Sequence, residues 1–107
     1  MSDFIQVQIT YPDEATAQTA ATTLVEQRLA ACVQVLGPIT SHYYWEERLE
    51  RSAEWTCTIK TRKTLFDLLA KTIRAHHPYD CPQIIAIPIV DCDSSYGDWL
   101  LQQTREC

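Results

Sequence analysis

The chain has 107 residues, which suits one domain with a single hydrophobic core. Apolar residues make up 46% and charged residues 21%, so the chain is globular rather than disordered. The net charge of −5 argues against a nucleic-acid binder, and no apolar run reaches the ~20 residues of a membrane helix. Because residues 1–4 do not resemble a secretory signal, we expect a cytoplasmic protein with one domain over residues 1–107.

A strand and a helix open the chain. Apolar and polar residues alternate over residues 4–10, as in a strand with one buried face. An early proline, two acidic residues and apolar side chains at helical spacing then predict a helix over residues 12–29. Residues 31–36 and 39–45 flank Gly37-Pro38 and favour strand structure, so they predict either one bent strand or two strands that meet.

The middle of the chain predicts a hairpin followed by a helix. Residues 46–52 are charged and turn-like, and alternation over residues 55–60 predicts a third strand that pairs with the second. Thr61 is expected to cap the next helix, which has leucines at helical spacing. That helix should end at His76-His77-Pro78, because the residue before a proline avoids the α conformation.

The last part of the chain predicts a strand and a short helix. Residues 83–90 form the strand, in which Pro88 cannot donate to a sheet ladder and so indicates an edge position or a bulge. Residues 94–103 form the helix, with Ser94 or Ser95 as its cap.

The predicted order is β-α-β-β-α-β plus a helix, which is the split β-α-β pattern of ferredoxin-like folds. This predicts the α+β class, with an antiparallel sheet, two helices on one sheet face and a short C-terminal helix. The other sheet face would expose apolar side chains, so the sequence also predicts self-association.

The loop from His76 to Pro82 has the highest density of reactive side chains, with two imidazoles, a phenol, a carboxylate and a thiol. Imidazole is a common metal ligand, so His76 and His77 are candidate ligands, to which Asp80 and Cys81 could add. The alternative is that both histidines only complete the helix, since a histidine near a helix C-terminus interacts well with the last carbonyls.

Three consecutive aromatic residues, Tyr43, Tyr44 and Trp45, form the second candidate site. Aromatic residues are enriched at interfaces, so we interpret them as a subunit interface. The alternative is a hairpin arm stabilised only by cross-strand pairs. A basic run over residues 60–63 could bind an anion at a helix N-terminus or could simply be solvated.

Catalytic motifs are missing from the sequence. It contains no G-x-S-x-G, no glycine-rich phosphate loop and no H-E-x-x-H. We therefore expect that the protein is not an enzyme.

Several segments, in collinear order, resemble the CutA family of divalent-cation tolerance proteins. The most specific are Leu29-Ala30-Ala31-Cys32-Val33, Tyr43-Tyr44-Trp45 and His77-Pro78-Tyr79-Asp80-Cys81-Pro82. The resemblance covers nearly the whole chain and ends near Trp99.

The resemblance implies a ferredoxin-like homotrimer assembled through sheet edges that takes part in the response to metal ions. Some members bind copper through paired histidines that correspond to His76 and His77, so copper or another divalent cation is the implied ligand. A cysteine three residues before the first proline is another implied ligand, and this chain has Ile9 there. The family also resembles PII-type trimers in fold, which leaves a regulatory trimer that binds a small anion or metabolite between subunits as the alternative function.

Overall fold

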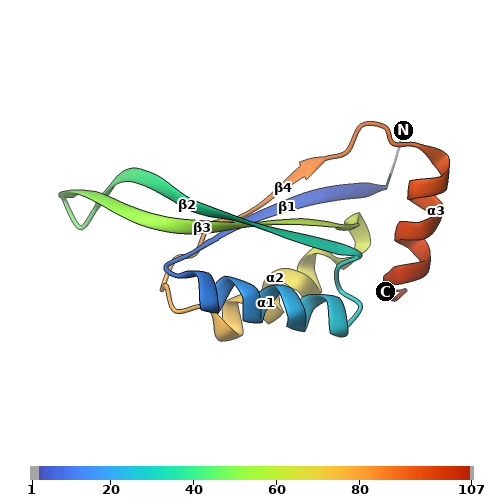
Figure 1. The fold of residues 1–107 in the computed structure, drawn as a ribbon, viewed down its shortest axis with the longest axis horizontal. Helices are drawn as coiled ribbons and strands as arrows, with labels where there is room; N and C mark the ends of the chain where they lie inside the picture. Colours follow the sequence, from blue (N-terminus) through green and yellow to red (C-terminus); the bar gives the residue numbers. More distant parts are fainter. Residues whose placement is uncertain (1–2, 107) are drawn as a thin grey trace.

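A four-stranded antiparallel sheet forms the centre of the computed structural model, which describes residues 3–106 (Figure 1). Helices α1 and α2 cover one face of the sheet, and α3 lies at one end. The strand order is β2-β3-β1-β4. In chain order the elements are β1 (Phe4–Tyr11), α1 (Glu14–Glu26), β2 (Cys32–Trp45), β3 (Arg48–Arg62), the 3₁₀ turn η1 (Lys63–Leu65), α2 (Phe66–His76), β4 (Ile84–Pro88) and α3 (Ser94–Gln103). The predicted α+β class with two helices on one sheet face is confirmed.

The core lies between the sheet and the two helices. Alternation along β1 turns Ile5, Val7 and Ile9 toward the helices, where each is buried. Val7 pairs with Ile59 of β3 in the antiparallel register, and helix side chains such as Leu69 cover these two residues from the helix side. Each fully buried side chain of this size stabilises the fold by about 1.5–3 kcal/mol relative to an exposed one. None of the helices in residues 3–106 is long and apolar enough to cross a membrane.

Helix α1 is shorter at both ends than the predicted helix over residues 12–29. Asp13 is its N-cap, and the Asp13 carboxylate accepts a 2.8 Å hydrogen bond from the Thr16 backbone N–H. This bond also lowers the pKa of Asp13. The helix ends at Glu26, and the chain then reverses through Arg28, whose φ of 61° cannot continue a right-handed helix.

The hairpin of β2 and β3 is longer than expected, and the predicted turn over residues 46–52 is wrong for most of its length. The turn consists of Glu46 and Glu47 alone, with φ angles of 49° and 64°, and β3 already begins at Arg48. Strand β2 continues through Gly37-Pro38 with a shift in register between Leu36 and Ile39. Residues 39–54, which we call the hairpin arm, extend beyond the helices (Figure 1).

Gly37 marks the base of the hairpin arm, and its missing side chain leaves room for an indole ring. A Cβ atom at Gly37 would lie 2.4 Å from Cδ1 and 2.6 Å from Cγ of Trp55. Those atoms belong to the root of the indole, so they move only if the whole ring shifts. We expect Gly37→Ala to lower the free energy of unfolding by about 1–3 kcal/mol, as measured by denaturant titration.

Thr40→Ala is the matched control for this prediction. Thr40 is exposed on the same strand, so its replacement should change the free energy of unfolding by no more than about 0.5 kcal/mol. A Gly37→Ala protein as stable as the wild type would show that Trp55 can be repacked without cost.

Two predicted helix caps are wrong. Thr61 lies in β3, where its buried hydroxyl donates a 2.6 Å hydrogen bond to the Leu29 carbonyl, and α2 begins after η1 without a side-chain cap. The cap of α3 is Asp93, which accepts a hydrogen bond from the backbone of Ser95, and neither Ser94 nor Ser95 is the cap. The C-terminal end of α2 and the edge position of β4 agree with the sequence prediction.

Candidate functional site

The hairpin arm and the loop after α2 meet at one cleft. Tyr43 and Trp45 line it from β2, and a cavity of about 450 Å³ separates them from the loop. Thr10 also lines the cleft, and it alternates with the core residue Ile9, so the cleft lies on the sheet face that the helices leave uncovered. The full lining is Thr10, Tyr43, Trp45, Glu54, Pro78, Tyr79, Asp80, Cys81 and Gln83. The structure thus brings parts of both sequence-predicted segments together.

A buried carboxylate lies in the wall of this cleft. Glu54 is 6% exposed, and its Oε2 accepts a 2.9 Å hydrogen bond from the Tyr79 hydroxyl. Burial raises the pKa of Tyr79 above its ordinary value, and the hydrogen bond to Glu54 raises it further. The phenol therefore remains a donor at neutral pH, and the pair ties the loop to the base of the hairpin arm.

The three aromatic residues of the arm do not share one environment. Tyr43 faces the cleft, where its hydroxyl lies 3.1 Å from the Ser52 hydroxyl on the opposite strand. Trp45 also lines the cleft and is half exposed. Tyr44 alternates to the other side and is 74% exposed. The interface role of Tyr43, Tyr44 and Trp45 stays a prediction, and the structure shows that it would involve both faces of the arm.

His77 is held in place by both of its ring nitrogens. The Tyr79 backbone N–H donates to Nδ1 at 3.1 Å, so Nε2 carries the proton and donates to the Thr10 carbonyl at 2.8 Å. The ring also stacks on Tyr11, with 4.6 Å between the ring centroids. To bind a metal ion, His77 would have to give up one of these hydrogen bonds.

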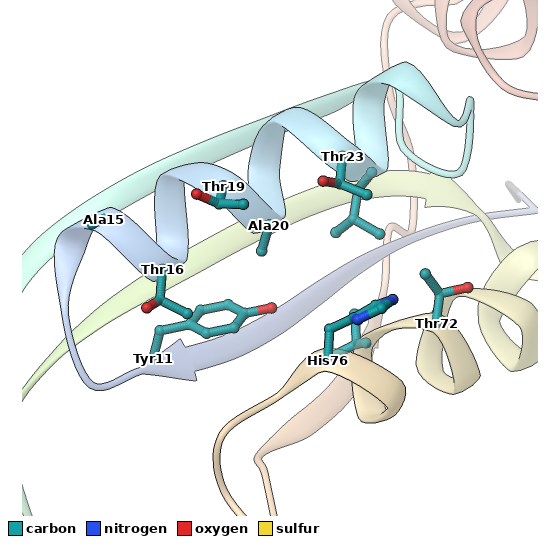
Figure 2. Close-up of a pocket in the computed structure, with 10 residues that line it drawn as sticks. Tyr11, Ala15, Thr16, Thr19, Ala20, Thr23, Thr72 and His76 are labelled. Atoms are coloured by element: carbon teal, nitrogen blue, oxygen red, sulfur yellow. The ribbon is translucent and has the colours of Figure 1, made fainter.

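His76 is exposed and lines a different hollow, the groove between α1 and α2 (Figure 2). Among residues 3–106 there is no group of three or more histidine, cysteine or acidic side chains that could hold a metal ion. Ile9, at the position where the family resemblance implies a cysteine, is fully buried in the core. These residues do not form a closed metal site, and ligation by His76 and His77 stays a prediction.

The basic run at the end of β3 has a structural role. Arg62 donates from Nε to the Thr104 hydroxyl at 2.7 Å and from a terminal nitrogen to the Leu101 carbonyl at 2.6 Å. Lys60 donates to the Gln34 side chain at 2.5 Å. Arg62 therefore holds the C-terminal end of α3, and this use removes one of the cations expected for anion binding.

Sequence reasoning missed Glu54. The only available signal was alternation, which extends from Thr56 and Thr58 back to Glu54 and places it on the same sheet face. Nothing local indicates that this carboxylate meets the hydroxyl of Tyr79, 25 residues later in the chain.

A protein-family model and several known proteins match most of the chain. A family model described as CutA1 divalent ion tolerance protein matches residues 5–103. The divalent-cation tolerance protein CutA of Thermus thermophilus is 41% identical over 98 residues, which are 92% of this chain and 95% of that protein. The chloroplastic protein CutA 1 of Oryza sativa is 38% identical over 102 residues, which are 95% of this chain. The chain spans 58% of the length of the rice protein.

Solved structures agree with these sequence matches. The divalent cation tolerance protein from Thermus thermophilus has a TM-score of 0.92 at 39% identity, over 95% of this chain and 99% of that one. CutA1 from Oryza sativa has a TM-score of 0.96 at 37% identity, over 99% of this chain and 97% of that one. The likeness therefore extends over almost all of the fold.

Proposed function

Because the chain belongs to the CutA1 divalent ion tolerance family, we propose that it contributes to divalent-cation tolerance as a homotrimer that binds metal ions weakly. The family name describes a tolerance and not a reaction, which fits the lack of a catalytic motif in the sequence. We propose that the protein is not an enzyme and that it acts in the cytoplasm.

The observation that carries the homotrimer is the apolar surface on the hairpin arm and on the edge strand. The large apolar side chains exposed on these two elements are Tyr43, Tyr44, Trp45, Leu49, Ile85 and Ile87. Leu36 is exposed just before the arm, and Val90 is exposed just beyond β4. Monomers rarely expose so many apolar groups on neighbouring elements. Strand β4 also has an open edge, which is a template for pairing with another chain.

The geometry suggests how copies of the chain would fit together. The hairpin arm extends past the helices of its own subunit (Figure 1). Its own subunit leaves the three aromatic side chains 41–74% exposed, without a surface that covers them. A partner subunit can supply that surface and pair its own strand edge with the arm. In the proposed homotrimer each copy would offer its arm to one neighbour and its open edge to the other, because a heterologous arrangement forms a ring when the rotation between copies closes.

Growth of cells that lack their own relative of this chain tests the function. The wild-type chain should restore growth in copper or zinc at concentrations that inhibit the deficient cells. Trp45→Ala, which removes an arm residue, should fail to restore growth although the protein is present at the same level. Restored growth with Trp45→Ala would show that metal tolerance does not require the arm. A wild-type chain that fails to restore growth would contradict the proposed function itself.

We propose that the exposed imidazole of His76 is the first metal ligand, with His77 as a second ligand only after loss of a hydrogen bond. We expect weak Cu(II) binding and weaker Zn(II) binding, in line with the usual affinity order of these ions. Because protons compete for an imidazole nitrogen, the affinity should fall between about pH 7.5 and about pH 5.5. Isothermal calorimetry at the two pH values measures both effects.

Histidine variants identify the ligands in the same measurement. His76→Ala combined with His77→Ala should abolish copper uptake while the oligomer persists, because neither ring belongs to the hairpin arm or to the open edge of β4. The matched control is His42→Ala, which removes an exposed histidine of the hairpin arm. Equal copper uptake by the double variant and the wild type would show that neither histidine is a metal ligand.

A further inference from the structure

A second hollow lies on the opposite side of the sheet from the cleft. It is a groove of about 530 Å³ between α1 and α2, and Tyr11 of β1 forms part of its floor (Figure 2). Its size falls within the range of about 300–1,000 Å³ that is typical of small-molecule sites. The lining consists of Tyr11, Ala15, Thr16, Thr19, Ala20, Thr23, Leu24, Thr72, Ile73 and His76. None of the residues assigned to the hairpin arm takes part.

The hydroxyl of Tyr11 is the polar group at the bottom of this groove. Tyr11 is only 3% exposed, and Figure 2 shows its hydroxyl pointing into the space between the two helices. Within residues 3–106 this hydroxyl makes no hydrogen bond to protein, whereas the buried Thr61 hydroxyl donates to the Leu29 carbonyl at 2.6 Å. Because no fully buried side-chain oxygen of these residues lacks a partner, the Tyr11 oxygen is accessible from the groove. A buried phenol that finds no protein partner is open to a partner from the groove side.

The Tyr11 ring is rigidly held. It stacks on His77 with 4.6 Å between the ring centroids and 19° between the planes. His77 is itself fixed by its hydrogen bonds to Thr10 and Tyr79. Burial raises the pKa of Tyr11, and the nearby Cys57 raises it further, so the phenol is a hydrogen-bond donor at neutral pH. A preorganised donor loses little entropy when it binds, which favours affinity.

The chemistry of the lining defines the class of ligand. No aspartate, glutamate, lysine or arginine lines the groove, so a charged molecule would lose its hydration without gaining a fixed counter-charge. Alanine, leucine and isoleucine side chains offer contact to an apolar body. The Thr72 hydroxyl already donates to the Leu68 carbonyl at 2.8 Å, and the Thr16 side chain is hydrogen-bonded to Asp13. Within residues 3–106 no such bond to protein is made by the hydroxyls of Thr19 and Thr23, so these two remain open to a ligand.

We propose that the groove between α1 and α2 binds a small uncharged organic molecule whose carbonyl oxygen accepts a hydrogen bond from Tyr11. This site is separate from the proposed metal tolerance and does not depend on it. Of the candidate metal ligands only His76 reaches the groove, at its rim. The fold thus offers a ligand site on its helix face and an assembly surface on its sheet face.

Benzamide is the probe, because it is uncharged and combines an apolar ring with a carbonyl oxygen. Titration followed by ¹H–¹⁵N correlation spectra of the full chain should shift the backbone signals of groove residues on α1 and α2, with a millimolar Kd typical of so small a ligand. Tyr11→Phe keeps the ring and its stacking on His77 but removes the donor. It should weaken binding about three- to tenfold, the usual net value of one hydrogen bond.

Two further variants keep the result interpretable. Tyr96→Phe removes a phenol on α3, outside the groove, and should leave the Kd unchanged. Thr19→Leu fills the groove from an exposed position on α1, where it threatens no core packing, and should abolish the shifts. Benzoate, which has the same ring with a charged group, should bind several-fold more weakly than benzamide.

Three outcomes would overturn the proposal. They are an absence of shifts at the groove, a Kd for Tyr11→Phe equal to that of the wild type, and tighter binding of benzoate than of benzamide. If the wild-type chain does not bind benzamide but still restores growth in copper, only the ligand proposal is wrong and the proposed role in metal tolerance stands. The two proposals therefore fail independently.

Discussion

Trp45→Ala is expected to dissociate the homotrimer at micromolar concentration, while Trp99→Ala leaves it assembled. The two indoles are a matched pair, since Trp45 is 47% exposed and Trp99 is 41% exposed in one chain. Trp45 lies at the end of the arm, where its own subunit presents only the loop after α2 across the cleft. Trp99 packs on Tyr96 of its own helix, with 5.5 Å between the ring centroids.

Truncation of a central tryptophan at an interface costs on the order of 2–4 kcal/mol, so its loss from each copy raises the dissociation constant many-fold. Analytical ultracentrifugation of both variants over a range of concentrations measures this effect. Circular dichroism of the dissociated Trp45→Ala protein checks that the subunit itself stays folded. If the two variants dissociate equally, the assembly surface includes α3, and the assignment of the interface to the arm is wrong.

Alkaline pH is expected to destabilise the fold through buried groups that resist ionisation. Burial raises the pKa of the Cys57 thiol from 9.0 to about 11, so the unfolded chain loses this proton first as the pH increases. The stabilisation from the neutral thiol is fully present below pH 9 and is lost as the pH rises toward 11. Between these values each such group lowers the free energy of unfolding by about 1.4 kcal/mol per pH unit. The buried Tyr11 phenol also lowers the free energy of unfolding as the pH rises, but only above pH 10.0, the pKa of tyrosine in the unfolded chain.

Denaturant unfolding at pH 8, 9, 10 and 11 measures this loss. Cys57→Ser keeps a donor toward the Ala17 carbonyl, which the thiol contacts at 3.6 Å, but cannot ionise in this range. It should therefore lose less stability between pH 9 and pH 11 than the wild type does. Tyr44→Phe, which removes an exposed phenol, should follow the wild-type curve. Parallel curves for Cys57→Ser and the wild type would show that the thiol is not the group responsible.

The order and type of the elements could be predicted from the sequence because each element has a strong local signal. Alternation marks β1, and helical spacing marks α1 and α2. The hairpin was the main failure. The charged residues 48–52 suggested a turn, yet an arm that extends away from the core can carry charged side chains within a strand, so charge does not mark its end. Thr61 likewise does not cap α2, because its hydroxyl donates a hydrogen bond to the Leu29 carbonyl, far away in the sequence.

The candidate site could be predicted only in part. The aromatic run and the loop after α2 stood out by composition, and the structure brings Tyr43 and Trp45 to the same cleft as Tyr79. Neither Glu54 nor the groove at Tyr11 could be predicted, because both arise from contacts between segments far apart in the chain. The adjacent residues His76 and His77 appeared to be one unit in the sequence. The backbone leaves the helix at His77, with a ψ of 136°, and sends the two rings to different sites.

The molar mass of the wild-type protein in solution tests the homotrimer most directly. Multi-angle light scattering coupled to size-exclusion chromatography, at micromolar concentration and neutral pH, should give three times the chain mass of 12.3 kDa. A mass of 12.3 kDa under these conditions would contradict the account, because the apolar arm and the open edge of β4 would then remain exposed in the native protein.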